Sequence, residues 1–266
     1  MILEKLLGSN YKWWYVAVYY YRLESAYLIN NLFHFLGQSI SIITAILIWG
    51  KVSSQSDTFT SVLLGAVLLA LSSNTSYWII GNSIKNGSLS RSLIQPNSIL
   101  TNYFMVSVGF LMRIGFYYFV IFSPFILFYS RQAMFRETSP MIYLILLSCI
   151  SMAFILRYLL SFLIGSAVFW TTQIDGQANF YENIFPLLAG VLYPFDIITL
   201  PWLKTILTFS PWSFVAYHPL QIYLGKYSQL QTIYVFLGGV AWCLVLYLLA
   251  KLVFKLGLKR YESVGL

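Results

Sequence analysis

The chain has 266 residues, of which 59% are hydrophobic and only 9% are charged, whereas about a quarter of the residues in a soluble domain are charged. This composition excludes a globular domain that folds in water, because several apolar stretches are as long as a transmembrane helix. The net charge of +8 comes from Lys and Arg residues that lie between and beside those stretches, a spread that indicates orientation signals and not nucleic-acid binding.

The first segment, residues 11–26, is crowded with Trp and Tyr, which prefer the headgroup layer of a bilayer. On a helix, Trp14 and Val18 would share one face, whereas Lys12 and Arg22 would lie on another, a pattern typical of a helix in the membrane interface. We therefore expect an interfacial entry helix. The alternative is that the segment is the polar start of the first span.

Six apolar segments are predicted to cross the bilayer, the fifth of them short, and they cover 27–49, 60–80, 103–128, 141–169, 180–193 and 232–254. Prolines punctuate the apolar stretch from the fifth span onward, and each removes a backbone donor. Irregular chain is tolerated at membrane depth only where it is shielded from lipid. We therefore predict an all-α polytopic membrane protein with one transmembrane domain over 1–266, and with a broken, re-entrant or extracellular helical hairpin over 194–225.

Six crossings place both termini on one side of the membrane. Nine Lys and Arg residues fall on that side and five on the other, so the positive-inside rule places both termini in the cytoplasm. The stretch 171–183 fits less well, because it should then be cytoplasmic but carries Asp175 and Glu182 without a basic residue. A seventh crossing is the alternative.

The sequence lacks the motifs of hydrolase, nucleotide-binding and metal sites. It contains no G-x-S-x-G elbow and no phosphate-binding loop of the G-x-x-x-x-G-K-S/T type. His34 and His218 have no second histidine or cysteine at ligand spacing, and each is expected to be a hydrogen-bonded packing residue. We therefore predict no catalytic residue, no metal site and no cofactor on this chain, so any ATP must be hydrolysed by another subunit.

Two arginines, Arg113 and Arg157, lie well inside the third and fourth predicted spans. A charge there costs about 2.5–3.5 kcal/mol on insertion scales, so both side chains should face protein or water. They either line a path for an anionic or amphiphilic substrate, or pair with carbonyls, a neighbouring span or a partner subunit. The residues alone leave both interpretations open.

The link between the second and third spans, residues 84–96, is predicted to contain a short amphipathic helix. An Asn-Gly pair at 86–87 turns the chain, Leu89 and Leu93 lie one helical turn apart, and Pro96 ends the helix. Such a helix, parallel to the membrane, suits docking into a groove of another protein. The alternative is an ordinary loop that follows the membrane surface.

This link resembles the one in ABC-2 type permeases, where an isoleucine, a basic residue and a glycine precede a leucine pair and a proline. The segments 188–190, 193–194, 200–203, 210–211 and 219–225, which include Pro194, Pro201, Trp202 and Pro211, look like that family's broken helical region. The tail 259–265 is similar to the basic-Tyr-acidic…Gly ending of one branch of uncharacterised permeases, although the last residue here is Leu266. The resemblance covers nearly the whole chain.

The resemblance implies the permease subunit of an ATP-driven exporter in the cytoplasmic (inner) membrane. A second permease, identical or a sister subunit, would complete the translocation path, and cytoplasmic ABC ATPase subunits would bind ATP and Mg. The N-terminal helix and the link would contact those ATPases, the link through Ile84, Lys85, Asn86, Gly87, Leu89, Arg91, Leu93 and Pro96. The path or its gate would involve Arg113, Arg157, Pro194, Asp196, Pro201, Trp202 and Pro211.

Two other classes compete with this interpretation. An ion-driven secondary carrier typically places acidic residues near the bilayer midplane, and no Asp or Glu lies clearly in the middle of a predicted span. A non-transporting membrane scaffold would need neither the link helix nor a cavity. Only the ATP-driven exporter predicts a stoichiometric ATPase partner.

Overall fold

The computed structural model describes residues 11–26, 76–95, 98–129 and 140–261, with single residues between 29 and 74. Within them the chain is helical and contains no strand, which confirms the all-α prediction for this part of the chain. The elements are α2 (Tyr11–Ser25), α5 (Ser76–Lys85), α6 (Leu89–Ile94), α7 (Ile99–Tyr129), α8 (Pro140–Ser166), α9 (Val168–Thr171), α10 (Asp175–Leu188), η3 (Phe195–Ile197), α11 (Pro201–Phe209), α12 (Tyr217–Tyr223) and α13 (Gln229–Leu258). Most of the first predicted span, about half of the second, His34 and Pro96 lie outside the described residues.

Two of the described helical stretches are long and apolar enough to cross a bilayer, namely Leu144–Thr171 and Gln229–Leu258. They overlap the fourth and sixth predicted spans. The first is the more buried of the two, because α8 packs against α5, α10, α12 and α13. The second, α13, exposes a long row of large apolar side chains, as expected of a helix that faces lipid. The count of six crossings stays a prediction.

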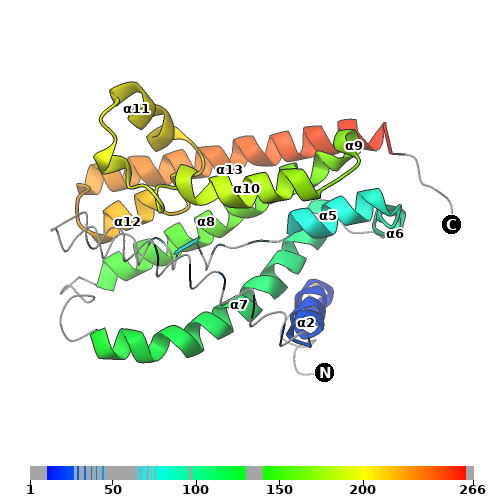
Figure 1. Cartoon of the computed structure of the whole chain (residues 1–266), viewed down its shortest axis with the longest axis horizontal. Helices are drawn as coiled ribbons and strands as arrows, with labels where there is room; N and C mark the ends of the chain where they lie inside the picture. Colours follow the sequence, from blue (N-terminus) through cyan, green and yellow to red (C-terminus); the bar gives the residue numbers. More distant parts are fainter. Residues whose placement is uncertain are drawn as a thin grey trace.

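The helices form an elongated bundle with two different ends (Figure 1). Helices α8, α10 and α13 run lengthwise beside one another, and α7 diverges from them. Helices α5, α6 and α9 and the C-terminus of α13 lie at one end, which we call the link end. The short elements α11 and α12 lie at the opposite end, which we call the broken-helix end.

Helix α2 lies crosswise to this bundle and is seen nearly end-on in Figure 1. It packs against α7 at a point where the two backbones come close: a β-carbon on Gly109 would lie only 2.5 Å from the carbonyl oxygen of Ala17. Ala17 is fully buried there. The small residues therefore allow an aromatic-rich helix to cross a long apolar one.

The chain between α10 and α13 is divided into short pieces. Pro194 precedes η3, Pro201 occupies the first turn of α11, and Pro211 lies buried in the turn that follows α11. Proline is tolerated in a first helical turn, where its missing N–H has no partner to lose. Helix α10 itself begins at Asp175, so most of the stretch 171–183 is helical.

Candidate functional site

The turn between α5 and α6 depends on Gly87. Its φ of 72° lies in the left-handed region, where a β-carbon is strained and glycine is favoured. The Gly87 carbonyl accepts a hydrogen bond of 2.8 Å from the Ser90 hydroxyl, which closes the first turn of α6. The exposed side chains of Lys85 and Asn86 flank the turn.

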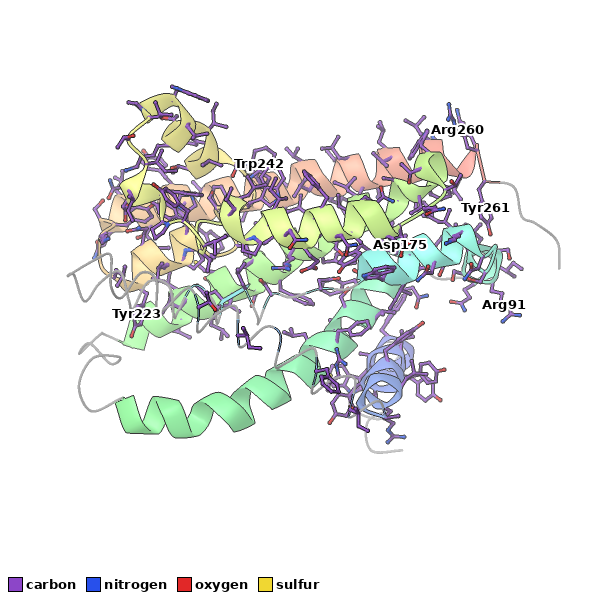
Figure 2. All side chains as sticks on the ribbon, viewed as in Figure 1. Arg91, Asp175, Tyr223, Trp242, Arg260 and Tyr261 are labelled. Atoms are coloured by element: carbon purple, nitrogen blue, oxygen red, sulfur yellow. The ribbon has the colours of Figure 1, made fainter. Side chains whose placement is uncertain are left out.

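Helix α6 has a buried base and an exposed tip. Leu89 is fully buried, as is most of Ile84 before the turn, whereas Leu93 is 40% and Ile94 is 85% exposed. Arg91 also faces outward, as Figure 2 shows at the link end. The two leucines, one helical turn apart, therefore differ in role: Leu89 anchors the helix and Leu93 belongs to the exposed tip.

Leu89 belongs to a buried core that contains aromatic side chains from several helices, which we call the aromatic floor. The core that contains Leu89 also includes Tyr103 of α7, Phe162 of α8 and Phe254 of α13. The Phe162 ring centroid lies 6.4 Å from that of Tyr103 and 5.5 Å from that of Phe254. A displacement of Leu89 would therefore press on a packed cluster that joins three long helices.

The last described residue, Tyr261, also reaches the turn. Its hydroxyl donates a hydrogen bond of 2.6 Å to the Gly87 carbonyl, and its ring packs edge-on against Phe169. Figure 2 shows Tyr261 beyond the end of α13, near Arg260 and α5. In the sequence, Tyr261 stands out only as part of the family-like tail, and no sequence pattern connects positions so far apart.

Arg157 pairs with a neighbouring helix, as one of the two sequence interpretations expects. It is 4% exposed, its Nη2 lies 3.6 Å from Oε2 of Glu182 in α10, and its guanidinium lies 4.0 Å from the centroid of the Phe185 ring. The Tyr77 hydroxyl donates to the other oxygen of Glu182 at 3.0 Å. The sequence does not identify Glu182 as this partner, because the pairing depends on how α10 packs against α8.

Arg113 is buried on α7, with 9% of its surface exposed, and its guanidinium lies 5.4 Å from the centroid of the Phe110 ring. The side chain therefore faces protein rather than the outside of the described bundle.

At the broken-helix end, Asp196 joins three short elements. One carboxylate oxygen accepts a hydrogen bond from Tyr217 at 3.1 Å, and the other accepts from Gln221 at 3.0 Å and from Lys226 at 3.3 Å. Lys204 of α11 lies 4.0 Å away. Burial opposes ionisation, but the hydrogen bond from Gln221 and the charge of Lys226 outweigh it and hold the pKa of the Asp196 carboxyl below its ordinary value.

His218 is a hydrogen-bonded packing residue, as the sequence predicts. Its Nε2 lies 2.9 Å from the Thr208 carbonyl oxygen and its Nδ1 lies 2.9 Å from the Tyr227 hydroxyl. The carbonyl can only accept, so Nε2 carries the proton and Nδ1 accepts from Tyr227. Burial lowers the pKa of His218 to about 4. Among the described residues, no group of three His, Cys, Asp or Glu side chains could hold a metal ion.

The candidate gate residues do not form one site with the two arginines. The contacts of Asp196 within the described part of the chain are with α11, α12 and Lys226, and not with Arg113 or Arg157. Trp202 is 62% exposed on α11. The proline-rich segment and the buried arginines are therefore separate features.

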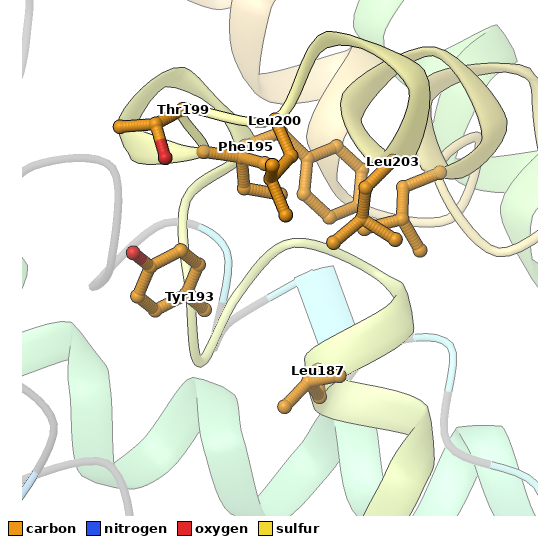
Figure 3. A pocket seen from close by; sticks show the side chains of 8 residues that line it. Leu187, Tyr193, Phe195, Thr199, Leu200 and Leu203 are labelled. Carbon is orange, nitrogen blue, oxygen red and sulfur yellow. The ribbon is translucent and has the colours of Figure 1, made fainter.

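Two hollows lie along α10 and share Leu187. The first has a volume of about 250 Å³ and is apolar (Figure 3), lined by Leu187, Tyr193, Phe195, Ile198, Thr199, Leu200, Leu203 and Leu207. The second, of about 420 Å³, is more open and is lined by Asn179, Phe180, Asn183, Ile184 and Leu187. Asn179 and Asn183 are both exposed, one helical turn apart. Exposed amides are costly in hydrocarbon, so this face of α10 is better suited to protein or water.

A family model described as ABC-2 family transporter protein matches residues 58–265 of the chain. The match takes in every described element from α5 to α13. Comparisons with curated proteins and with solved structures give no match.

Proposed function

Because the chain belongs to the ABC-2 family of transporter proteins, we propose that it is the permease subunit of an ATP-driven exporter in the cytoplasmic membrane. Permeases of this family are membrane components without an ATP-binding domain of their own. Separate ATPase subunits would bind ATP and Mg, and a second permease, identical or a sister subunit, would complete the path.

The observation that carries this proposal is the construction of α6. Ile94 is 85% exposed and Leu93 is 40% exposed at its tip, whereas Leu89 at its base is fully buried. Covering an exposed aliphatic side chain of this size stabilises a complex by about 1.5–3 kcal/mol. The tip would therefore bind a partner protein favourably, while the base holds α6 to the bundle. This combination suits an element that receives force from a partner.

Charge supports a cytoplasmic position for the link end. It carries exposed Lys85 and Arg91, together with Lys255, Lys259 and Arg260 at the end of α13, whereas the broken-helix end carries Lys204 and Lys226. Cytoplasmic segments are enriched in Lys and Arg. In this orientation the crosswise helix α2 lies in the inner interface, where it can also contact an ATPase, and Asp196 holds the outer gate closed.

The proposed path runs along the outward face of α10. Asn179 and Asn183 would face a water-containing space between two permeases, with Leu187 leading to the apolar cavity near α11. Closure of the ATPases would move α6, and the buried core that Leu89 shares with α7, α8 and α13 would pass that movement on. The result is a change of access to the space between the two subunits.

The test is purification of the tagged chain from its native membrane in mild detergent, followed by identification and quantification of any P-loop ATPase. We expect a stoichiometric ATPase with the unaltered chain and its loss in Ile94→Glu. Gln95→Glu is the matched control, because it adds the same charge at the neighbouring exposed position and removes no apolar surface. Export activity of the purified chain without any ATPase would overturn the proposal.

The ion-driven carrier stays the second candidate because of Glu182. This carboxylate lies within α10, although Arg157 neutralises it at 3.6 Å. If transport in vesicles depends on an ion gradient and not on ATP, that result would favour the ion-driven carrier.

A further inference from the structure

We infer that Tyr261 is a positioning residue for the turn at residues 86–88 between α5 and α6, which we call the coupling turn. Its hydroxyl ties the Gly87 carbonyl to the end of α13, so movement of α6 reaches α13 directly. The inference rests on the proposed function, since it gives the link a second attachment to the membrane-spanning bundle. The hydrogen bond of 2.6 Å joins residues 174 positions apart in the sequence. It is the kind of long-range contact that fixes a short turn in place.

The phenol is aimed at the turn by a fixed support. The Tyr261 N–H donates to the Leu258 carbonyl at 3.3 Å, and the Arg260 N–H donates to the Gly257 carbonyl at 2.9 Å, so the chain continues to turn after α13 ends. The Tyr261 ring lies 6.1 Å from that of Phe169, which lies 5.6 Å from the Phe254 ring. Tyr261 therefore moves with α9 and α13 and not as a loose tail.

The acceptor of this hydrogen bond is the carbonyl of Gly87, the residue with a restricted backbone conformation in the turn. Gly87 adopts a positive φ, and its carbonyl also accepts from Ser90 in the first turn of α6. A donor at this carbonyl therefore orients both the end of α5 and the start of α6. Leu89 attaches the same turn to the aromatic floor through apolar contact, and Tyr261 adds a directional bond to α13.

These two attachments have different consequences for coupling. Apolar contacts are not directional and tolerate sliding, whereas a hydrogen bond weakens steeply when its angle or length changes. Loss of the Tyr261 hydroxyl should therefore leave α6 folded and still able to bind an ATPase, but less firmly oriented relative to α13. The expected defect is in transmission and not in assembly.

The test compares Tyr261→Phe with Tyr234→Phe, which removes a hydroxyl from an exposed tyrosine at the other end of α13. Phenylalanine keeps the ring packing against Phe169, and equal melting temperatures of the two variants establish that both are folded. In the purified permease, hydrogen–deuterium exchange of residues 85–95 should be about 2- to 10-fold faster in Tyr261→Phe, the range that corresponds to one net hydrogen bond. Exchange in α8 should be unchanged.

The second readout uses the complex with its ATPase. Tyr261→Phe should retain the ATPase at the same stoichiometry but transport less substrate for each ATP hydrolysed, whereas Tyr234→Phe should match the unaltered chain. Unchanged exchange over 85–95 would refute the attachment itself. Faster exchange with an unchanged ratio of transport to hydrolysis would refute the role in transmission. If no ATPase is bound by the unaltered chain, the proposed function fails, and the exchange result alone decides whether Tyr261 positions the turn.

Discussion

The ion pair between Arg157 and Glu182 allows a quantitative test of how the bundle holds a buried charge. At the observed separation of 3.6 Å, the Coulomb attraction is about 4–5 kcal/mol for an effective dielectric constant of about 20. The Glu182 side chain is 36% exposed, so solvent screens part of this energy, whereas the Arg157 side chain is only 5% exposed. The two partners should therefore respond differently to neutralisation.

We expect Glu182→Gln to lower the free energy of unfolding by about 2–4 kcal/mol, because it leaves the buried Arg157 charge without compensation. Glutamine keeps an oxygen that can accept from Tyr77, so the change isolates the charge. Arg157→Gln should cost less, about 1–2 kcal/mol, because the remaining carboxylate reaches solvent. The double variant should be more stable than Glu182→Gln alone.

The assay is reversible unfolding in mixed micelles, followed by the loss of helical circular dichroism. Asp175→Asn is the control, since it removes an exposed carboxylate from the first turn of the same helix and should cost less than about 1 kcal/mol. If the losses of the two single variants simply add in the double variant, the pair makes no net contribution, and the reasoning about the buried charge is wrong.

Three further results are expected. Burial lowers the pKa of His218 from 6.5 to about 4, so as the pH falls the unfolded chain binds a proton at this histidine before the folded chain does. The free energy of unfolding should therefore be constant above pH 6.5 and decrease between pH 6.5 and 4. In unfolding curves measured over this range, His218→Gln should show a smaller decrease. Leu89→Asp should lower the free energy of unfolding by about 3 kcal/mol or more because the side chain is fully buried, whereas Ile94→Asp, at 85% exposed, should leave the melting temperature almost unchanged. Gly109→Val should loosen α2 from α7, since a β-carbon would lie 2.5 Å from the Ala17 carbonyl, and faster proteolysis of the N-terminal segment would report it.

The sequence predicts the helices well where one physical requirement decides the outcome. A long apolar run in a bilayer favours a helix, because a helix satisfies its backbone hydrogen bonds within the one segment. The Leu144–Thr171 and Gln229–Leu258 helices accordingly overlap the predicted spans. The sequence predicts the fifth span from residue 180, and α10 begins before it at Asp175, where an acidic first turn stabilises the start of the helix.

The site is less accessible to sequence reasoning, because burial is decided by partners that are distant in the chain. Helical spacing places Leu89 and Leu93 near one another, but only the aromatic floor decides that Leu89 is covered and Leu93 is exposed. A buried Arg157 needs a partner, but only the packing of α8 against α10 shows that this partner is Glu182. Tyr261 meets Gly87 only because α13 ends beside the turn.

The length of α13 relates the position of the link end to the thickness of the bilayer. Its 30 residues extend about 45 Å, whereas the hydrocarbon layer is about 30 Å thick, so the helix must tilt or protrude. Hydrophobic mismatch then determines how far the C-terminal turn with Tyr261 stands from the lipid headgroups. Reconstitution into lipids of graded acyl length would therefore change the position of this turn without altering a single amino acid.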